Sequence, residues 1–131
     1  MCLTRRQREI LFDIVSNSCF TYPCHGHLAF AFSGSKLVSV CPNICMQKKY
    51  HHETSTKYTV HAEIHLLLTL KRLKVKPNRI KVISIGIRDG KVRNGIPCNL
   101  CHNQLLSLGY HKIVYSDLNA EFKPLKSSYQ S

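Results

Sequence analysis

Two segments decide the fold of this chain: HAEIHLLLTLKRL at residues 61–73 and PCNLCHNQLLSLG at residues 97–109. The first places leucines around most of a helical circumference, which predicts a mostly buried helix. In the second, a proline precedes an amphipathic run that ends at a glycine. Pro97 fits the first position of a helix, and we expect the helix to run over 98–108 and to stop at Gly109. Each predicted helix therefore begins at a short cluster of histidine, cysteine or glutamate residues.

The segments around these two helices alternate between helical and strand patterns. Thr4 and Gln7 form a capping-box pattern, and the apolar residues that follow at helical spacing predict a first helix ending near Ser16. Short apolar runs over 27–32 and 37–41 flank a Ser-Gly-Ser turn and predict a β-hairpin. We also expect strands over 80–87, 113–115 and 121–125, the last of them antiparallel, and a long loop over 44–58.

This order of elements predicts an α/β fold. Strands joined through a helix are usually parallel neighbours in a sheet that helices cover. Residues 1–131 are therefore expected to form one domain with a mixed sheet of about five strands and a C-terminal β-hairpin. The length suffices to bury a core without disulfides, and no apolar run is long enough to span a bilayer.

Charge and cysteine content narrow the function classes. The net charge is +12, from 19 Lys and Arg against 7 Asp and Glu. Such a balance favours anionic partners, although solubility alone is an equally good explanation. Seven cysteines, an odd number, indicate thiols or metal ligands in a reducing compartment. The first six residues carry no signal-peptide hydrophobic region, so we expect an intracellular protein without membrane association.

The two helix starts carry metal-binding chemistry. Cys98 and Cys101 lie three residues apart and share one helical face, and positive potential at a helix start favours thiolates. If His61 meets them, a three-ligand tetrahedral site with one open position results. Zn²⁺ with two thiolates and a neutral imidazole sums to zero charge. Excess negative charge from the ligands would therefore not strongly weaken the activation of a water in the open position.

Glu63 distinguishes a catalytic site from a structural one. A Cys-x-x-Cys pair alone often marks a structural zinc or a redox site. A structural site needs a fourth protein ligand, and it has no use for a carboxylate two residues beyond His61. Glu63 is placed to take a proton from water and deliver it to a substrate.

Together, His61-Ala62-Glu63 and Pro97-Cys98-Asn99-Leu100-Cys101 resemble the signature of the zinc-dependent cytidine and deoxycytidylate deaminase superfamily. The stretch 87–90, with Asn94, is also similar to small phage and viral deaminase-like proteins. The resemblance implies a three-layer α/β/α fold and release of ammonia as water attacks the amine-bearing ring carbon. It implies zinc ligands His61, Cys98 and Cys101, proton transfer by Glu63, and substrate contacts from Asn43, Ala62 and Pro97.

The resemblance leaves the substrate open. A hairpin end over 121–125 favours the branch that includes free cytidine deaminases, but Cys45 stands where those enzymes typically carry a glutamate. The loop over 47–57 joins Lys48 and Lys49 to Tyr50, which suits a phosphate-bearing or single-stranded substrate. We therefore expect cytosine deamination in a nucleoside, a nucleotide or a single-stranded nucleic acid. Adenosine or cytosine deamination in RNA and a non-catalytic, zinc-containing nucleic-acid-binding module are the alternatives, and a homodimer or homotetramer is the expected assembly.

Two further clusters have competing interpretations. One is a run of basic residues that either extends a track for a polynucleotide or forms a solvated face. Its members are Lys71, Arg72, Lys74, Lys76, Arg79 and Lys81. The other comprises Cys24, Cys41 and Cys45, for which buried thiols are a better explanation than a second metal site.

Overall fold

The computed structural model describes residues 3–17, 26–47, 57–88 and 91–125. Within these ranges the chain forms three α-helices, a short 3-10 helix and eight strands. In chain order they are α1 (Arg5–Asn17), β1 (Gly26–Ser33), β2 (Lys36–Pro42), β3 (Ile44–Gln47), β4 (Lys57–Val60), α2 (Ala62–Leu73), η1 (Pro77–Arg79), β5 (Lys81–Arg88), β6 (Lys91–Arg93), α3 (Asn99–Ser107), β7 (Lys112–Ser116) and β8 (Phe122–Pro124).

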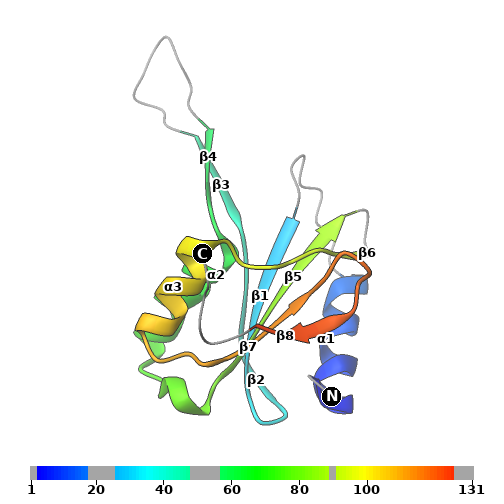
Figure 1. Cartoon of the computed structure of the whole chain (residues 1–131), viewed down its shortest axis with the longest axis horizontal. Coiled ribbons are helices and arrows are strands. Elements are labelled where there is room, and N and C mark those ends of the chain that lie inside the picture. The colour runs from blue at the N-terminus through cyan, green and yellow to red at the C-terminus, as the bar shows by residue number, and fades with distance from the viewer. Residues whose placement is uncertain (1–2, 18–25, 48–56, 89–90, 126–131) are drawn as a thin grey trace.

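A six-stranded mixed sheet forms the middle layer. Its order is β2-β1-β5-β7-β8, with β6 paired to β5. Strands β5 and β7 are parallel, as expected for strands joined through α3, and β8 runs antiparallel to β7. Helix α1 lies on one face of the sheet, while α2 and α3 lie on the other (Figure 1). The predicted three-layer α/β/α architecture and C-terminal hairpin are confirmed, and β6 is a strand that the sequence analysis missed.

The alternation of side chains along β1 separates the two layers of the core. Leu28, Phe30 and Phe32 pack in the cluster that contains residues of α1. Ala29 and Ala31, which point to the opposite face, pack in the cluster that contains residues of α2 and α3. Because these alanines are small, α2 can lie close to the sheet, and this closeness brings its first turn against the central strands.

Helix α1 begins with the predicted capping box. The backbone N–H of Thr4 donates to Oε1 of Gln7, and the backbone N–H of Gln7 donates to Oγ1 of Thr4, both at 3.1 Å. The same Gln7 side chain donates to the carbonyl of Gly34 at 2.8 Å and accepts from Nζ of Lys81 at 3.0 Å. One buried amide therefore caps α1 and attaches it to the β1–β2 turn and to β5.

The C-terminal hairpin is held by Asp117. Its carboxylate accepts backbone N–H bonds from Asn119 and Glu121 at 2.8 and 2.9 Å, and it pairs with Nζ of Lys123 at 3.0 Å. The N–H of Glu121 and the Lys123 ammonium hold the pKa of the Asp117 carboxyl below its usual value. These bonds fix the reversal from β7 into β8.

The prediction of a continuous loop over 44–58 is wrong at both ends. Strands β3 and β4 pair antiparallel as a separate two-stranded ribbon, which extends away from the sheet (Figure 1). A ribbon outside the main sheet needs no alternating apolar face, so its strands lack the pattern that identifies strands in a sequence. Residues 48–56, with Lys48, Lys49 and Tyr50, lie outside the described residues. In the part of the chain that the structure describes, no helix is long and apolar enough to cross a membrane.

Candidate metal centre

His61 and Cys98 occupy equivalent positions in their two helices. His61 is the N-cap of α2 and Cys98 is the N-cap of α3, and both have extended backbones, with ψ of 146° and 166°. The prediction that Pro97 occupies the first helical position is therefore wrong. Because Cys98 is extended, α3 starts one residue later, and Pro97 precedes the cap as a buried residue.

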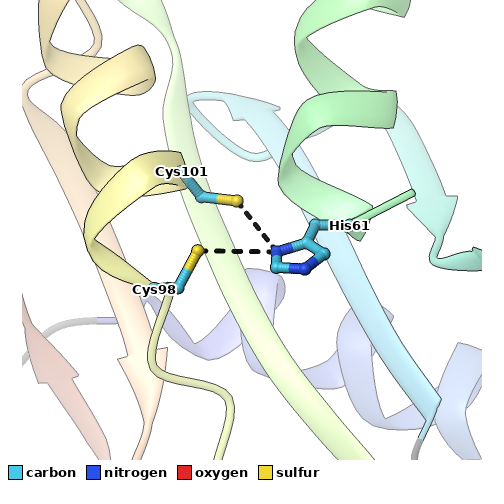
Figure 2. A group of neighbouring side chains, drawn as sticks. All are labelled: His61, Cys98 and Cys101. Atoms are coloured by element: carbon cyan, nitrogen blue, oxygen red, sulfur yellow. Dashed lines mark hydrogen bonds between the residues drawn. The ribbon is translucent and has the colours of Figure 1, made fainter. Parts of the chain in front are cut away.

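The three predicted ligands come together between the two helix starts. Nδ1 of His61 lies 3.2 Å from Sγ of Cys101 and 3.5 Å from Sγ of Cys98 (Figure 2). All three ligand atoms lie within 4.8 Å of one another, so the group could hold a metal ion. In a tetrahedral zinc site with ordinary bond lengths, nitrogen and sulfur ligands are about 3.6 Å apart. The side chains therefore fit Zn²⁺, with His61 and Cys98 exposed and Cys101 buried.

The electrostatics of Cys101 differ from the sequence prediction. Burial raises the pKa of the Cys101 thiol, and the Glu63 carboxylate and the Cys98 thiol raise it further. The expectation that a helix start lowers the thiol pKa is thus wrong for Cys101, because desolvation and a neighbouring negative charge outweigh the helix dipole. A metal ion must displace the Cys101 proton in order to bind.

Glu63 lies in the first turn of α2 and points into the protein. Only 4% of the residue is exposed. The hydroxyl of Ser84, a fully buried residue of β5, donates to Oε1 of Glu63 at 2.5 Å. A carboxylate thus lies beside the Cys101 sulfur, as expected for a proton carrier at a metal centre. Glu63 is evident from the sequence, whereas Ser84 is not, because its signal there is only a lone hydroxyl in an apolar strand.

The segment that carries Cys98 is fixed by a close crossing of backbones. A Cβ atom on Gly86 would overlap the carbonyl of Asn94, and one on Gly95 would overlap the backbone of Ile85 and Gly86. The N–H of Gly95 also donates to the carbonyl of Ser116 at 2.7 Å. Glycines at both positions let this segment lie directly on β5, which places the start of α3 beside the start of α2.

The β3–β4 ribbon brings Asn43 close to the ligands in the fold. Ile44 pairs with Val60, so Asn43 and His61 flank the last pair of the ribbon. Asn43 is buried, and its Oδ1 accepts the backbone N–H of His27 at 2.9 Å. Part of its hydrogen-bonding capacity therefore joins β1 to the end of β2. Ala62, also buried, is the first residue of α2, and its place beside His61 is compatible with the expected substrate contact.

The predicted basic run lies away from the metal centre. Lys71 and Arg72 are in the last turn of α2, whereas His61 caps its first turn. Ten residues of helix separate their backbones by about 15 Å. The rest of the run continues into η1 and the start of β5, so it gathers at the far end of α2 and does not line the three ligands.

Cys41 is a buried thiol in the described structure. Its sulfur lies 3.5 Å from Oγ1 of Thr69 and 3.7 Å from Oγ of Ser39. Within the described ranges, His61, Cys98 and Cys101 form the one group of three or more His, Cys, Asp or Glu side chains that could hold a metal. Cys24 lies outside the described residues, and the Cys45 side chain is not described, so a second site stays untested.

No protein-family model and no curated protein matches this sequence. Solved structures do. The cytidine deaminase from Burkholderia pseudomallei is 12% identical, with a TM-score of 0.59 over 95% of this chain and 94% of that one. Cytidine deaminases from Mycobacterium tuberculosis and Mycobacterium leprae are 16% and 13% identical, with TM-scores of 0.52 and 0.51. They cover 92% and 90% of this chain, and the matches include 87% and 89% of their own lengths. The chain therefore has the cytidine deaminase fold.

Proposed function

We propose that this protein is a zinc-dependent hydrolase that deaminates a cytosine base to uracil. One observation carries the proposal: the buried Glu63 carboxylate adjoins a His61, Cys98 and Cys101 group with the spacing of a tetrahedral zinc site. A structural zinc site would need a fourth protein ligand and would gain nothing from that carboxylate. The exposed edges of His61 and Cys98 leave one side of the group accessible to a substrate.

The roles of the side chains follow from their positions. His61, Cys98 and Cys101 hold the metal, and when bound, zinc supplies the Lewis acidity that activates a water molecule. The Glu63 carboxylate accepts a proton from the attacking water and passes it to the substrate. A carbon–oxygen bond forms, the carbon–nitrogen bond breaks, and the amine leaves as ammonia.

We favour a free cytosine nucleoside or nucleotide as the substrate. Strand β8 pairs antiparallel with β7, as in the branch of the superfamily whose fold ends in a hairpin. By the resemblance, that branch includes the free cytidine deaminases. The structurally similar proteins from Burkholderia and Mycobacterium are themselves cytidine deaminases. The basic run at the far end of α2 lies too distant to contact a small substrate at the metal centre. Asn43, Ala62 and Pro97 are the proposed substrate contacts.

A single-stranded polynucleotide is the second candidate. The net charge of +12 favours an anionic partner. The β3–β4 ribbon, whose second strand leads directly into His61, projects away from the sheet (Figure 1). RNA adenosine would require the same metal chemistry at a different ring carbon. A non-catalytic zinc-containing binding module is less consistent with the buried Glu63. We propose one domain over residues 1–131, acting inside the cell as a homodimer or homotetramer.

A substrate panel read by mass tests these proposals. Zinc-loaded protein is incubated with cytidine, deoxycytidine, dCMP, adenosine, and single-stranded DNA and RNA oligonucleotides. Deamination raises the substrate mass by about 1 Da, because an amine is replaced by an oxygen. We expect turnover of a free cytosine nucleoside or nucleotide that changes little with salt. Turnover of oligonucleotides alone, falling steeply with salt, would establish the second candidate, and no turnover of any substrate would contradict the proposed enzyme.

A further inference from the structure

We infer that Ser84 is a positioning residue that holds the Glu63 carboxyl in its reactive orientation. The inference rests on the proposed deaminase function and adds a residue that neither motif contains. Ser84 lies in β5, outside both ligand-bearing helices, and its hydroxyl donates to Oε1 of Glu63 at 2.5 Å.

The placement of Ser84 departs from the pattern of its strand. In β5, Ile83 and Ile85 pack in the cluster on the α1 side, while Val82 packs in the cluster on the α2 side. Ser84 shares the parity of Val82 and therefore points beneath α2. It is fully buried there, opposite Ala29 in the neighbouring strand. An apolar residue would fit this position, so the hydroxyl needs an explanation.

Glu63 depends on few partners for its orientation. Within the described chain, none of the ion pairs involves Glu63, although 4% exposure leaves it little access to water. The Ser84 hydroxyl donates to this carboxylate from a fully buried position, so it is placed to keep Oε1 where it lies.

Ser84 also connects Glu63 to the segment that carries Cys98. Its Oγ lies 2.6 Å from the carbonyl oxygen of Gly95, three residues before Cys98. Both oxygens are acceptors and the serine hydroxyl has one hydrogen, so it donates to one of them at a time and can turn from one to the other. Through this one group, the carboxyl on α2 is held in register with the cysteine at the start of α3.

The chain offers a second buried serine as a control for a purely structural role of Ser84. Ser116 is also fully buried, lies on the adjacent strand β7, and donates to the carbonyl of Arg93 at 2.5 Å. Both serines thus fix the 93–95 segment to the sheet, but only Ser84 contacts Glu63. If Ser84 served only this attachment, Ser84→Ala and Ser116→Ala would have similar effects on activity.

The experiment compares Ser84→Ala, Ser84→Thr and Ser116→Ala with the wild type. The measurements are kcat and KM for cytosine substrates, zinc content, thermal stability, and crystal structures of the metal-free proteins. We expect Ser84→Ala to lower kcat by about 10- to 100-fold with little change in KM, because a hydrogen bond to a charged group is lost. Ser84→Thr should restore most of the activity, and Ser116→Ala should change kcat less than about 3-fold even if it lowers stability equally. The crystal structures should show the Glu63 carboxyl displaced only in Ser84→Ala.

The outcomes separate the two proposals. An active wild type with equally active Ser84→Ala, or with Glu63 undisplaced in that variant, overturns the role of Ser84 and leaves the deaminase proposal intact. Equal losses in Ser84→Ala and Ser116→Ala also overturn it. If Ser84→Ala does not fold, the kcat and stability of Ser84→Thr are compared with those of Ser116→Ala. An inactive Ser84→Thr variant with native stability contradicts the inference. A wild type without turnover of any cytosine or adenine substrate removes the function itself, and the positioning role with it.

Discussion

Nδ1 of His61 lies 3.5 Å from Sγ of Cys98, although 37 positions separate the two residues in the chain. Each residue caps the start of its own helix, so the contact exists only when α2 and α3 are both docked on the sheet. A metal that binds these atoms together binds the folded protein more tightly than the unfolded chain. Zinc binding and folding are therefore expected to be coupled.

Removal of a ligand should abolish zinc retention. Cys98→Ala leaves two protein ligands from a three-ligand set, which is too few for a stable zinc site. We expect the variant to contain little zinc after dialysis and to lose the stabilisation that added zinc gives the wild type. Elemental analysis and thermal unfolding measure both effects. Cys41→Ala is the matched control, because Cys41 is a buried thiol outside the group; zinc loss in that variant would contradict the assignment.

Zinc affinity should rise with pH. Burial and the Glu63 carboxylate raise the pKa of the Cys101 thiol, so Cys101 is protonated in the metal-free protein at neutral pH. Zinc must displace that proton, and each displaced proton changes the apparent affinity by about tenfold per pH unit below the pKa. Competition with a chelator between about pH 6.5 and 8.5 measures the slope. Affinity that is independent of pH would show that Cys101 is already a thiolate.

Glu63→Gln should remove catalysis without removing the metal. Glutamine has the shape of glutamate and can still accept the Ser84 hydroxyl, so the fold and the three ligands stay in place. It cannot accept a proton from water, and we expect kcat to fall by about 10²- to 10⁴-fold. Zinc content should equal that of the wild type, since a neutral neighbour no longer opposes the Cys101 thiolate. Robust turnover by this variant would exclude Glu63 as the proton carrier.

The candidate ligands could be predicted from the sequence because their chemistry is local. His61, Cys98 and Cys101 stand at recognisable helix starts, and the apolar patterns of the main strands and helices are confirmed by the structure. The sequence missed β6 and the β3–β4 ribbon because very short strands show no period of their own. Ser84 and the raised pKa of Cys101 depend on which side chains meet beneath α2, and that is set by packing between distant segments.

Alanine at Gly86 or Gly95 should destabilise the fold and disturb the metal centre together. A Cβ at either position would overlap the backbone of the other segment, and backbone atoms cannot rotate away. We expect each substitution to lower the free energy of unfolding by about 1–3 kcal/mol or more. Gly34→Asn is the control, because Gly34 has a φ of +61° but nothing within 4 Å of an added Cβ. Urea unfolding with zinc analysis tests this, and a Gly95→Ala variant of native stability and zinc content would contradict the close crossing.

Neutralising the basic run should leave the turnover of small substrates unchanged. Lys71→Gln/Arg72→Gln removes two exposed charges at the end of α2 that lies opposite the metal centre. The separation of about 15 Å exceeds the Debye length at physiological ionic strength, so kcat/KM for a nucleoside should stay within about twofold of the wild type. Arg5→Gln/Arg6→Gln is the charge-matched control, since those exposed side chains lie on α1 across the sheet.

The same pair of variants tests the polynucleotide candidate. If single strands contact the end of α2, loss of two phosphate contacts should flatten the plot of log K against log salt by about 1.4. The α1 control should leave that slope unchanged, whereas equal effects of both pairs would show that binding follows net charge alone. A large fall in nucleoside turnover in Lys71→Gln/Arg72→Gln would contradict the separation of the basic run from the site, because screened charges at that distance cannot act on a small substrate.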